Sequence, residues 1–178
     1  MNLALSECRQ TRHQNAVYLL DSLIRLEPLN DTAYNNRGLC KHHLGGTQNA
    51  LRDVDFAISL NDSNAGYFIN AGSFLMTLRD FKRSHGAFSS ALRLDSMSSA
   101  AWNGRAIAKY ELGRYGEAII DMTKAINIEP SNSEFLLSRA KLLLKTGNKT
   151  YACKDILKAA KLGNQEALEF PKSLCNTR

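Results

Sequence analysis

The feature that most constrains this 178-residue chain is a period of 34 residues, which runs through four consecutive blocks without insertion or deletion. Each block has a large apolar residue at position 4, glycine or alanine at position 8, a small residue at 20, an apolar residue at 24 and alanine at 27. Such a period is typical of repeat arrays in which each unit is one supersecondary element. The blocks are residues 31–64, 65–98, 99–132 and 133–166.

The spacing of these positions predicts two helices in each block. Positions 4 and 8 share one helix face, and positions 20, 24 and 27 share another. One helical pair is too small to bury its own apolar face, so neighbouring pairs must stack to complete a core. A turn between the two helices is expected at position 15, which holds Gly45, Arg79, Gly113 and Gly147.

This pattern resembles the tetratricopeptide repeat, which has a large residue at position 4, small residues at 8, 20 and 27 and a proline near 32. The stretch from Ala101 to Pro130 follows the family pattern most closely. The resemblance covers nearly the whole chain and implies an all-α fold, a right-handed α-solenoid of antiparallel helix pairs that forms a superhelix. Lys41 and Lys109 depart from the family at position 11, where an aromatic residue is usual, and we expect looser packing there.

A degenerate repeat precedes the four blocks, and a capping segment follows them. Counting back from Pro28 puts Leu20 at position 24 and Met1 at position 5, so residues 1–30 form a repeat that is truncated at its N-terminus. Residues 167–178 include apolar side chains that can cover the last helical pair, as terminal repeats require. We therefore expect a single domain over all 178 residues, with five repeats and a C-terminal cap.

Composition and charge narrow the class of protein. Apolar residues make up 44% and charged residues 22%, which is ordinary for a globular chain. No apolar run approaches the roughly 20 residues of a membrane span, and charged side chains interrupt the first 30 residues, so we expect a cytoplasmic protein without membrane insertion. The net charge of +6 is concentrated in residues 133–178, which hold nine basic and four acidic side chains.

Nothing in the pattern predicts catalysis, a cofactor or a metal. The sequence has neither a phosphate-binding glycine loop nor a G-x-S-x-G motif. His42 and His43 are adjacent, so a helix would point them about 100° apart. An even number of cysteines permits disulfides, but without a secretory segment we expect reduced, structural thiols. The four cysteines are not spaced from one another or from a histidine as the ligands of a metal site are. They are Cys8, Cys40, Cys153 and Cys175.

Positions 7 and 23 carry arginine and aspartate together in three repeats and neither residue in the other two. Half-buried charges need partners, and losing one partner of a pair costs more than losing both. The alternative is that repeats of close ancestry share both residues. We predict structural ion pairs between the two helices of a repeat: Arg37–Asp53, Arg105–Asp121 and Arg139–Asp155.

The resemblance also implies that one face of each first helix lines a concave groove that binds a peptide. Amides there can donate to and accept from an extended backbone, although Asn36 and Asn70 are equally compatible with solvated or capping roles. Lys141 and Lys145 suit a peptide with an acidic end, the alternative being an ordinary solvated lysine face. The predicted groove residues are Asn35, Asn36, Leu39, Ile69, Asn70, Ser73, Asn103, Ile107, Tyr110, Leu137, Lys141 and Lys145.

These patterns predict a non-catalytic scaffold or adaptor that binds an extended peptide or a helix of another protein. Some family members bind the C-terminal tails of chaperones through a carboxylate clamp. No three consecutive repeats of this chain carry the charges that such a clamp needs, so a chaperone tail is not supported as the partner. The alternative function is RNA binding by the basic C-terminal third, which the uncharged centre of the groove disfavours. Self-association through the N-terminal face stays open.

Overall fold

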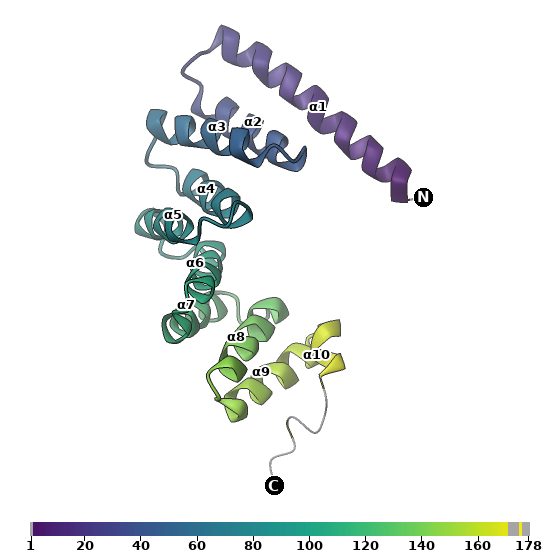
Figure 1. Cartoon of the computed structure of the whole chain (residues 1–178), viewed down its shortest axis with the longest axis vertical. Helices are drawn as coiled ribbons and strands as arrows, with labels where there is room; N and C mark the ends of the chain where they lie inside the picture. Colours follow the sequence, from purple (N-terminus) through teal and green to yellow (C-terminus); the bar gives the residue numbers. More distant parts are fainter. Residues whose placement is uncertain (1, 171–174, 176–178) are drawn as a thin grey trace. The chain divides into compact units, whose positions relative to one another are not determined.

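The computed structural model describes the backbone of residues 2–170 and Cys175, and the side chains of residues 11–170 and Cys175. This part of the chain is all-α, with ten helices and no strand. The chain divides into two compact units, residues 1–95 and 96–178, each built from paired helices (Figure 1). Whether residues 1–178 act as one domain of five repeats stays a prediction.

Unit 1 is built from two helical pairs and one long helix. The helix α2 packs along α3, and α4 packs along α5. The long helix α1 contacts α2, and α3 contacts α4, so that successive elements are stacked within the unit. The helices are α1 (Asn2–Leu26), α2 (Asp31–His43), α3 (Thr47–Leu60), α4 (Ala65–Thr77) and α5 (Phe81–Leu94).

Unit 2 repeats this plan with two helical pairs and a short terminal helix. The helix α6 packs along α7, α8 packs along α9, and α7 contacts α8. The short helix α10 lies against α9. The helices are α6 (Ser99–Glu111), α7 (Tyr115–Ile128), α8 (Ser133–Lys145), α9 (Lys149–Lys161) and α10 (Gln165–Glu169).

Local sequence sets where the helices begin and turn. The first helix of each pair is preceded by a residue whose side chain accepts a hydrogen bond from a backbone N–H of the first turn. These N-caps are Asn30, Asn64, Ser98 and Asn132. The two helices of a pair are joined at position 15 by a residue with positive φ, which is Arg79 in one pair and glycine in the other three.

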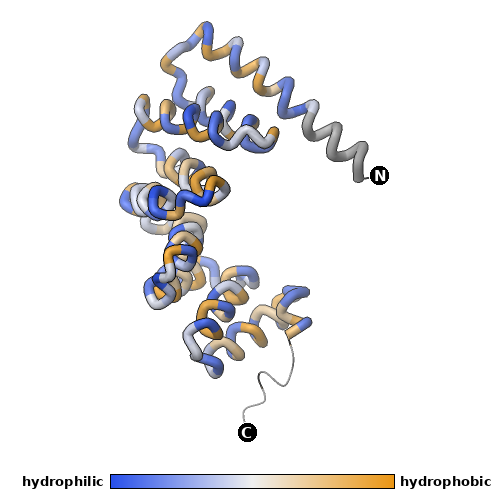
Figure 2. Tube along the Cα trace, in the orientation of Figure 1, coloured by the Kyte–Doolittle hydropathy of each residue, from blue (hydrophilic) through white to orange (hydrophobic). Residues whose placement is uncertain are grey.

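The core of each unit comes from the recurring small and apolar positions. Ala50, Val54 and Ala57 are fully buried in unit 1, and the corresponding Ala118, Met122 and Ala125 are buried in unit 2. Hydrophilic and hydrophobic residues are interspersed along α2 to α9, as expected for helices that bury one face (Figure 2). The repeat positions read from the sequence are therefore the ones that pack the helical pairs together.

The first helix, α1, is longer than the others and runs without interruption over 25 residues, from Asn2 to Leu26. The sequence predicted a truncated helical pair here, but Thr11 stands at position 15, where three of the four following blocks have glycine. Tyr18 and Leu19 on this helix are 69% and 67% exposed. Across the described residues, no helix combines the length and apolar character that crossing a membrane requires.

The cysteines differ from expectation. A disulfide joins Cys153 on α9 to Cys175, with a Cα–Cα distance of 5.3 Å, whereas the sequence favoured reduced thiols. Position 21 turns the Cys153 side chain inward, where Cys175 lies within disulfide reach of it. Cys40 is a free, half-buried thiol.

Candidate functional site

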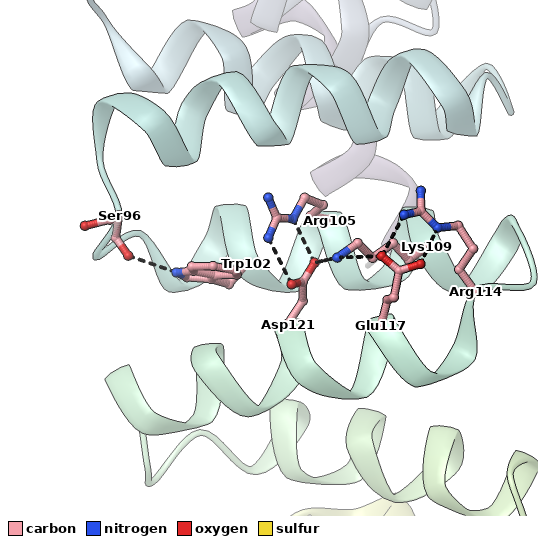
Figure 3. A network of polar contacts seen from close by, with 7 residues as sticks. All are labelled: Ser96, Trp102, Arg105, Lys109, Arg114, Glu117 and Asp121. Atoms are coloured by element: carbon pink, nitrogen blue, oxygen red, sulfur yellow. Dashed lines mark hydrogen bonds and ion pairs between the residues drawn. The ribbon is translucent and has the colours of Figure 1, made fainter.

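The Arg–Asp positions form bidentate pairs inside three helical repeats. In unit 2, Arg105 Nε and Nη2 donate to Asp121 Oδ2 and Oδ1 at 2.7 and 2.9 Å (Figure 3). Arg139 donates to both oxygens of Asp155 at 2.7 and 2.8 Å. Planar, bidentate pairing of this kind fixes the angle between two side chains as well as their distance. Each pair therefore locks the second helix of a repeat against the first.

Two lysines that sequence analysis associated with looser packing bind these same aspartates. Lys109 Nζ lies 2.7 Å from Asp121 Oδ2, and Lys41 Nζ lies 2.8 Å from Asp53 Oδ2. The expectation of looser packing was wrong, because each lysine is a second cation on a buried carboxylate. Position 11 of the last repeat is Leu143, so Asp155 has Arg139 but no lysine there.

The network around Asp121 extends to the turn between α6 and α7. Lys109 also approaches Glu117 at 3.8 Å, and Arg114 pairs with Glu117 at 2.6 Å (Figure 3). The hydrogen bonds from Arg114 lower the pKa of Glu117. On the other side, the Arg105 guanidinium lies over the Trp102 ring, 4.7 Å from its centroid. These charges are paired with one another, so this network has a structural role.

The arginines also reach the preceding repeat. Arg37 Nη1 donates to Asp21 on α1 at 2.7 Å, and Arg139 Nη1 donates to Thr123 on α7 at 3.1 Å. Both acceptors stand at position 25 of the preceding block. One guanidinium therefore joins the two helices of its own repeat to the helix that precedes them.

A pocket opens on the first helices of the two repeats in unit 2, α6 and α8. It lies between α6, α7 and α8 and has a volume of about 200 Å³. Ile107 and Tyr110 on this surface are 38% and 39% exposed. The pocket brings together three predicted groove residues, Ile107, Tyr110 and Lys141. Its other lining residues were not predicted to bind: Ala106, Met122, Ser138 and Leu142.

Cationic and aromatic groups surround this pocket. Lys141 Nζ lies 2.6 Å from Glu166 Oε1 on α10. Lys145 Nζ lies over the Tyr115 ring at 5.9 Å, and the Tyr115 and Tyr110 rings are 5.4 Å apart. The pocket therefore combines an apolar interior with cations at its edge. Asn103, another predicted groove residue, is half-buried on the same α6 helix and does not line the pocket.

The corresponding surface of unit 1 is polar and uncharged. Asn70 donates to Asn35 at 2.8 Å, and Asn35 donates to Asn36 at 3.2 Å. Asn36 is exposed, as is Ser73, whose hydroxyl donates to the backbone oxygen of Ile69 at 2.9 Å. Leu39 and Ile69 are half-buried. The amides thus form a chain across α2 and α4.

Two predicted groove residues are buried. Asn35 is 7% exposed and Leu137 is 1% exposed, so neither is available to a partner in this conformation. Both stand at position 5. In unit 1 this position faces the next first helix, where Asn70 covers Asn35. Leu137 is part of the core of unit 2.

Three of the four histidines, His13, His42 and His43, lie together at the C-terminal end of α2. His13 and His43 stack with ring centroids 4.7 Å apart, and His42 contacts Phe74 at 4.6 Å. Burial, together with the nearby His43, lowers the pKa of His42. Among the described residues, no group of histidine, cysteine, aspartate or glutamate side chains is arranged to hold a metal.

Residues 70–129 match the family model of the tetratricopeptide repeat, over the stretch that contains the Asp121 network and the α6 side of the pocket. This chain is a tetratricopeptide repeat (TPR) protein. The match covers the end of unit 1 and the start of unit 2, so both units contain TPR sequence. The remaining repeats follow the same 34-residue period.

Known TPR proteins share this fold. Human tetratricopeptide repeat protein 6 is 30% identical over 170 residues, which is 94% of this chain and 32% of that protein. The solved structure of Pseudomonas aeruginosa pilF has a TM-score of 0.84 at 17% identity and covers 97% of this chain and 80% of that one. YrrB, described as a TPR protein with an unusual peptide-binding site, has a TM-score of 0.76 at 18% identity over 89% of this chain and 82% of that one. The chain spans less than a third of the length of the curated relatives it matches.

Proposed function

We propose that this TPR protein is a non-catalytic scaffold or adaptor that binds a segment of another protein on the surface of its first helices. The pocket between α6, α7 and α8 is the observation that carries the proposal, because it exposes Ile107 and Tyr110 beside Lys141. Apolar anchors next to a few oriented polar groups are typical of sites that bind peptides. The peptide-binding site named for YrrB supports this use of the fold.

The partner is an extended peptide or a helix that places a side chain in the pocket. Unit 1 offers a separate polar surface, on which the exposed amide of Asn36 and the hydroxyl of Ser73 can hydrogen-bond a peptide backbone independently of unit 2. In unit 2, the apolar pocket supplies contact area and its lining lysine, Lys141, supplies charge. Leu137 and Asn35 are not part of the proposed binding set, because both are buried.

Site-specific photo-crosslinking tests the proposal. A photoreactive phenylalanine analogue in place of Tyr110 samples the pocket, and the same analogue in place of Tyr151 samples α9 outside it. Both tyrosines are exposed, at 39% and 63%. We expect cross-linked partner peptides at Tyr110 and none at Tyr151, identified by mass spectrometry. Equal capture at the two sites, or capture at Tyr151 alone, would rule out the pocket as the binding site.

The same samples test the alternatives. Binding of RNA through the basic C-terminal third would give cross-links to nucleic acid that weaken steeply with salt. Self-association would give cross-links to the chain itself and a mass that rises with concentration. Cytoplasmic location stays a prediction, and the Cys153–Cys175 disulfide bears on it because cytosolic thiols are normally kept reduced.

A further inference from the structure

The pocket between α6, α7 and α8 has the size and lining to hold one apolar side chain. Its volume is about 200 Å³, and Ile107, Tyr110 and Met122 give it apolar walls. A cavity of about 150 Å³ lined by apolar side chains holds a benzene molecule. One aromatic or branched aliphatic group therefore fits.

The lysine that lines this pocket is paired with a carboxylate from outside the pocket. Lys141 lines the pocket, and its Nζ lies 2.6 Å from Oε1 of Glu166 on α10. The two side chains are 50% and 55% exposed. An ion pair this exposed adds little to stability, because water solvates each partner well when they separate. A carboxylate arriving from solution can therefore replace that of Glu166 with little loss.

We infer that the pocket selects a peptide segment in which an apolar side chain is followed closely by a carboxylate, and that this carboxylate takes the place of Glu166 on Lys141. The inference rests on the proposed function, since it names the chemistry of the segment that the same pocket binds. Glu166 acts as an internal competitor: while it pairs with Lys141, it masks the charge that the ligand's carboxylate needs.

The charge around the pocket favours an acidic ligand over a neutral one. Lys145 lies one turn beyond Lys141 on α8 and has no carboxylate partner among the described residues, its Nζ lying instead over the Tyr115 ring. Residues 133–178 hold nine basic and four acidic side chains. An uncharged apolar peptide would fill the pocket but leave both lysines without a new partner.

The test compares two small probes that differ only in charge. N-acetylphenylalanine carries an aromatic ring and a carboxylate, and N-acetylphenylalanine amide carries the ring alone. NMR titration that follows the backbone amides of Ile107 and Ser138 gives a Kd for each. In Glu166→Gln we expect the carboxylate probe to bind about two- to fivefold more tightly than in the native chain, with the amide probe unchanged. This gain should disappear in 1 M salt.

Matched variants isolate the exchange. Glu169→Gln removes an exposed carboxylate from the same α10 helix and should leave both probes unchanged. Lys141→Gln should remove the preference for the carboxylate, while Lys158→Gln on α9 should not. Ile107→Ser should weaken both probes alike.

Two results separate the inference from the proposed function. If the Glu166→Gln variant binds the carboxylate probe no more tightly than the native chain does while Tyr110 still cross-links a partner, the carboxylate exchange is wrong and the proposed function stands. If the probes respond as expected but Tyr110 captures no protein, the exchange holds as a property of the pocket and the proposed function is wrong.

Discussion

The guanidinium of Arg37 on α2 donates hydrogen bonds to both oxygens of the Asp53 carboxylate on α3, with Nε–Oδ2 and Nη2–Oδ1 distances of 2.8 and 2.7 Å. These hydrogen bonds raise the pKa of Arg37 above its ordinary value. The same geometry recurs at Arg105 and Arg139, always 16 residues before the aspartate. The three pairs differ in the number of cations on the carboxylate, and this difference makes their energetics testable.

Removing Asp121 should destabilise the protein more than removing Asp155. Asp121→Asn leaves Arg105 and Lys109 without their buried partner, whereas Asp155→Asn leaves only Arg139. Breaking a buried pair costs about 3–5 kcal/mol when a charge stays uncompensated. We expect a loss in that range for Asp121→Asn and a loss smaller by about 1 kcal/mol or more for Asp155→Asn.

Urea unfolding of the two variants at pH 7 measures the difference. Because both aspartates lie in unit 2, the comparison stays within one folding unit. Asp121→Asn combined with Arg105→Gln and Lys109→Met should recover part of the loss, since the two cations that faced Asp121 are gone. An Asp155→Asn variant as unstable as Asp121→Asn would show that the lysine does not contribute.

Gly38→Ala should destabilise unit 1, and Gly86→Ala should stabilise it. A Cβ on Gly38 would lie 2.9 Å from the backbone oxygen of Ala50 and 3.0 Å from Val54 Cγ2, so α2 and α3 would have to move apart. Overpacking of this kind costs about 1–3 kcal/mol. Gly86 lies in α5 with nothing within 4 Å of its added Cβ, and alanine there gains about 0.5–1 kcal/mol of helix stability. Thermal unfolding of both variants should move in opposite directions, and a shift of the same sign would contradict the close approach at Gly38.

Arg79→Gly should raise stability by about 0.5–1 kcal/mol. Arg79 has φ of 61° in the turn between α4 and α5, where the other three turns have glycine with φ from 76° to 86°. A side chain in this left-handed conformation is strained, and glycine removes the strain. Arg79→Ala is the control, because it removes the guanidinium over Phe81 but keeps a Cβ. If the alanine variant is stabilised as much as the glycine variant, the gain does not come from the backbone.

Sequence alone predicts the repeated framework well because its positions are set by backbone packing. Alanine at 27 or glycine at 8 is required wherever two helices approach closely, so the period shows directly in the residues. The pairing of positions 7 and 23 is visible for the same reason. Contacts between elements that are not one period apart leave no such pattern: neither Glu166 near Lys141 nor Cys175 near Cys153 follows from any spacing.

The proposed binding surface was predicted from the sequence only in part, for a physical reason. The family pattern assigns the same groove positions to the first helix of every repeat. A neighbouring helix can nevertheless bury the residue at one of these positions. Position 5 shows this, because Asn35 is covered by Asn70 and Leu137 joins the core of unit 2. The lysines at position 11 were also misjudged, because they were expected only to loosen the packing. Their role depends on the aspartate at position 23 that faces them, which position 11 alone does not reveal.

Stability of unit 1 should fall as the pH drops below about 6.5. Burial and the nearby His43 lower the pKa of His42, so the unfolded chain binds more protons than the folded one between the two pKa values. The contribution of His42 is therefore fully present above the ordinary histidine pKa of about 6.5 and is lost as the pH falls toward the folded value. Denaturant unfolding between pH 7.5 and 5 should show this slope. His42→Gln should flatten this slope, and a slope unchanged in that variant would exclude His42 as its cause.

Reduction of the disulfide should lower the stability of unit 2. Cys153 and Cys175 are 22 residues apart, and a loop of this size restricts the unfolded chain enough to contribute about 3 kcal/mol. A reducing agent should therefore lower the unfolding midpoint of the native chain. Cys175→Ser should show the lowered midpoint without a reducing agent and no further change with one, whereas Cys40→Ser should keep the full difference, because Cys40 is free. Thiol labelling of protein taken directly from its cells then shows whether the two cysteines are reduced or oxidised there. Labelled Cys153 and Cys175 would fit a reducing cytoplasm, where the disulfide gives no stabilisation. Protected cysteines would place the chain in an oxidising compartment.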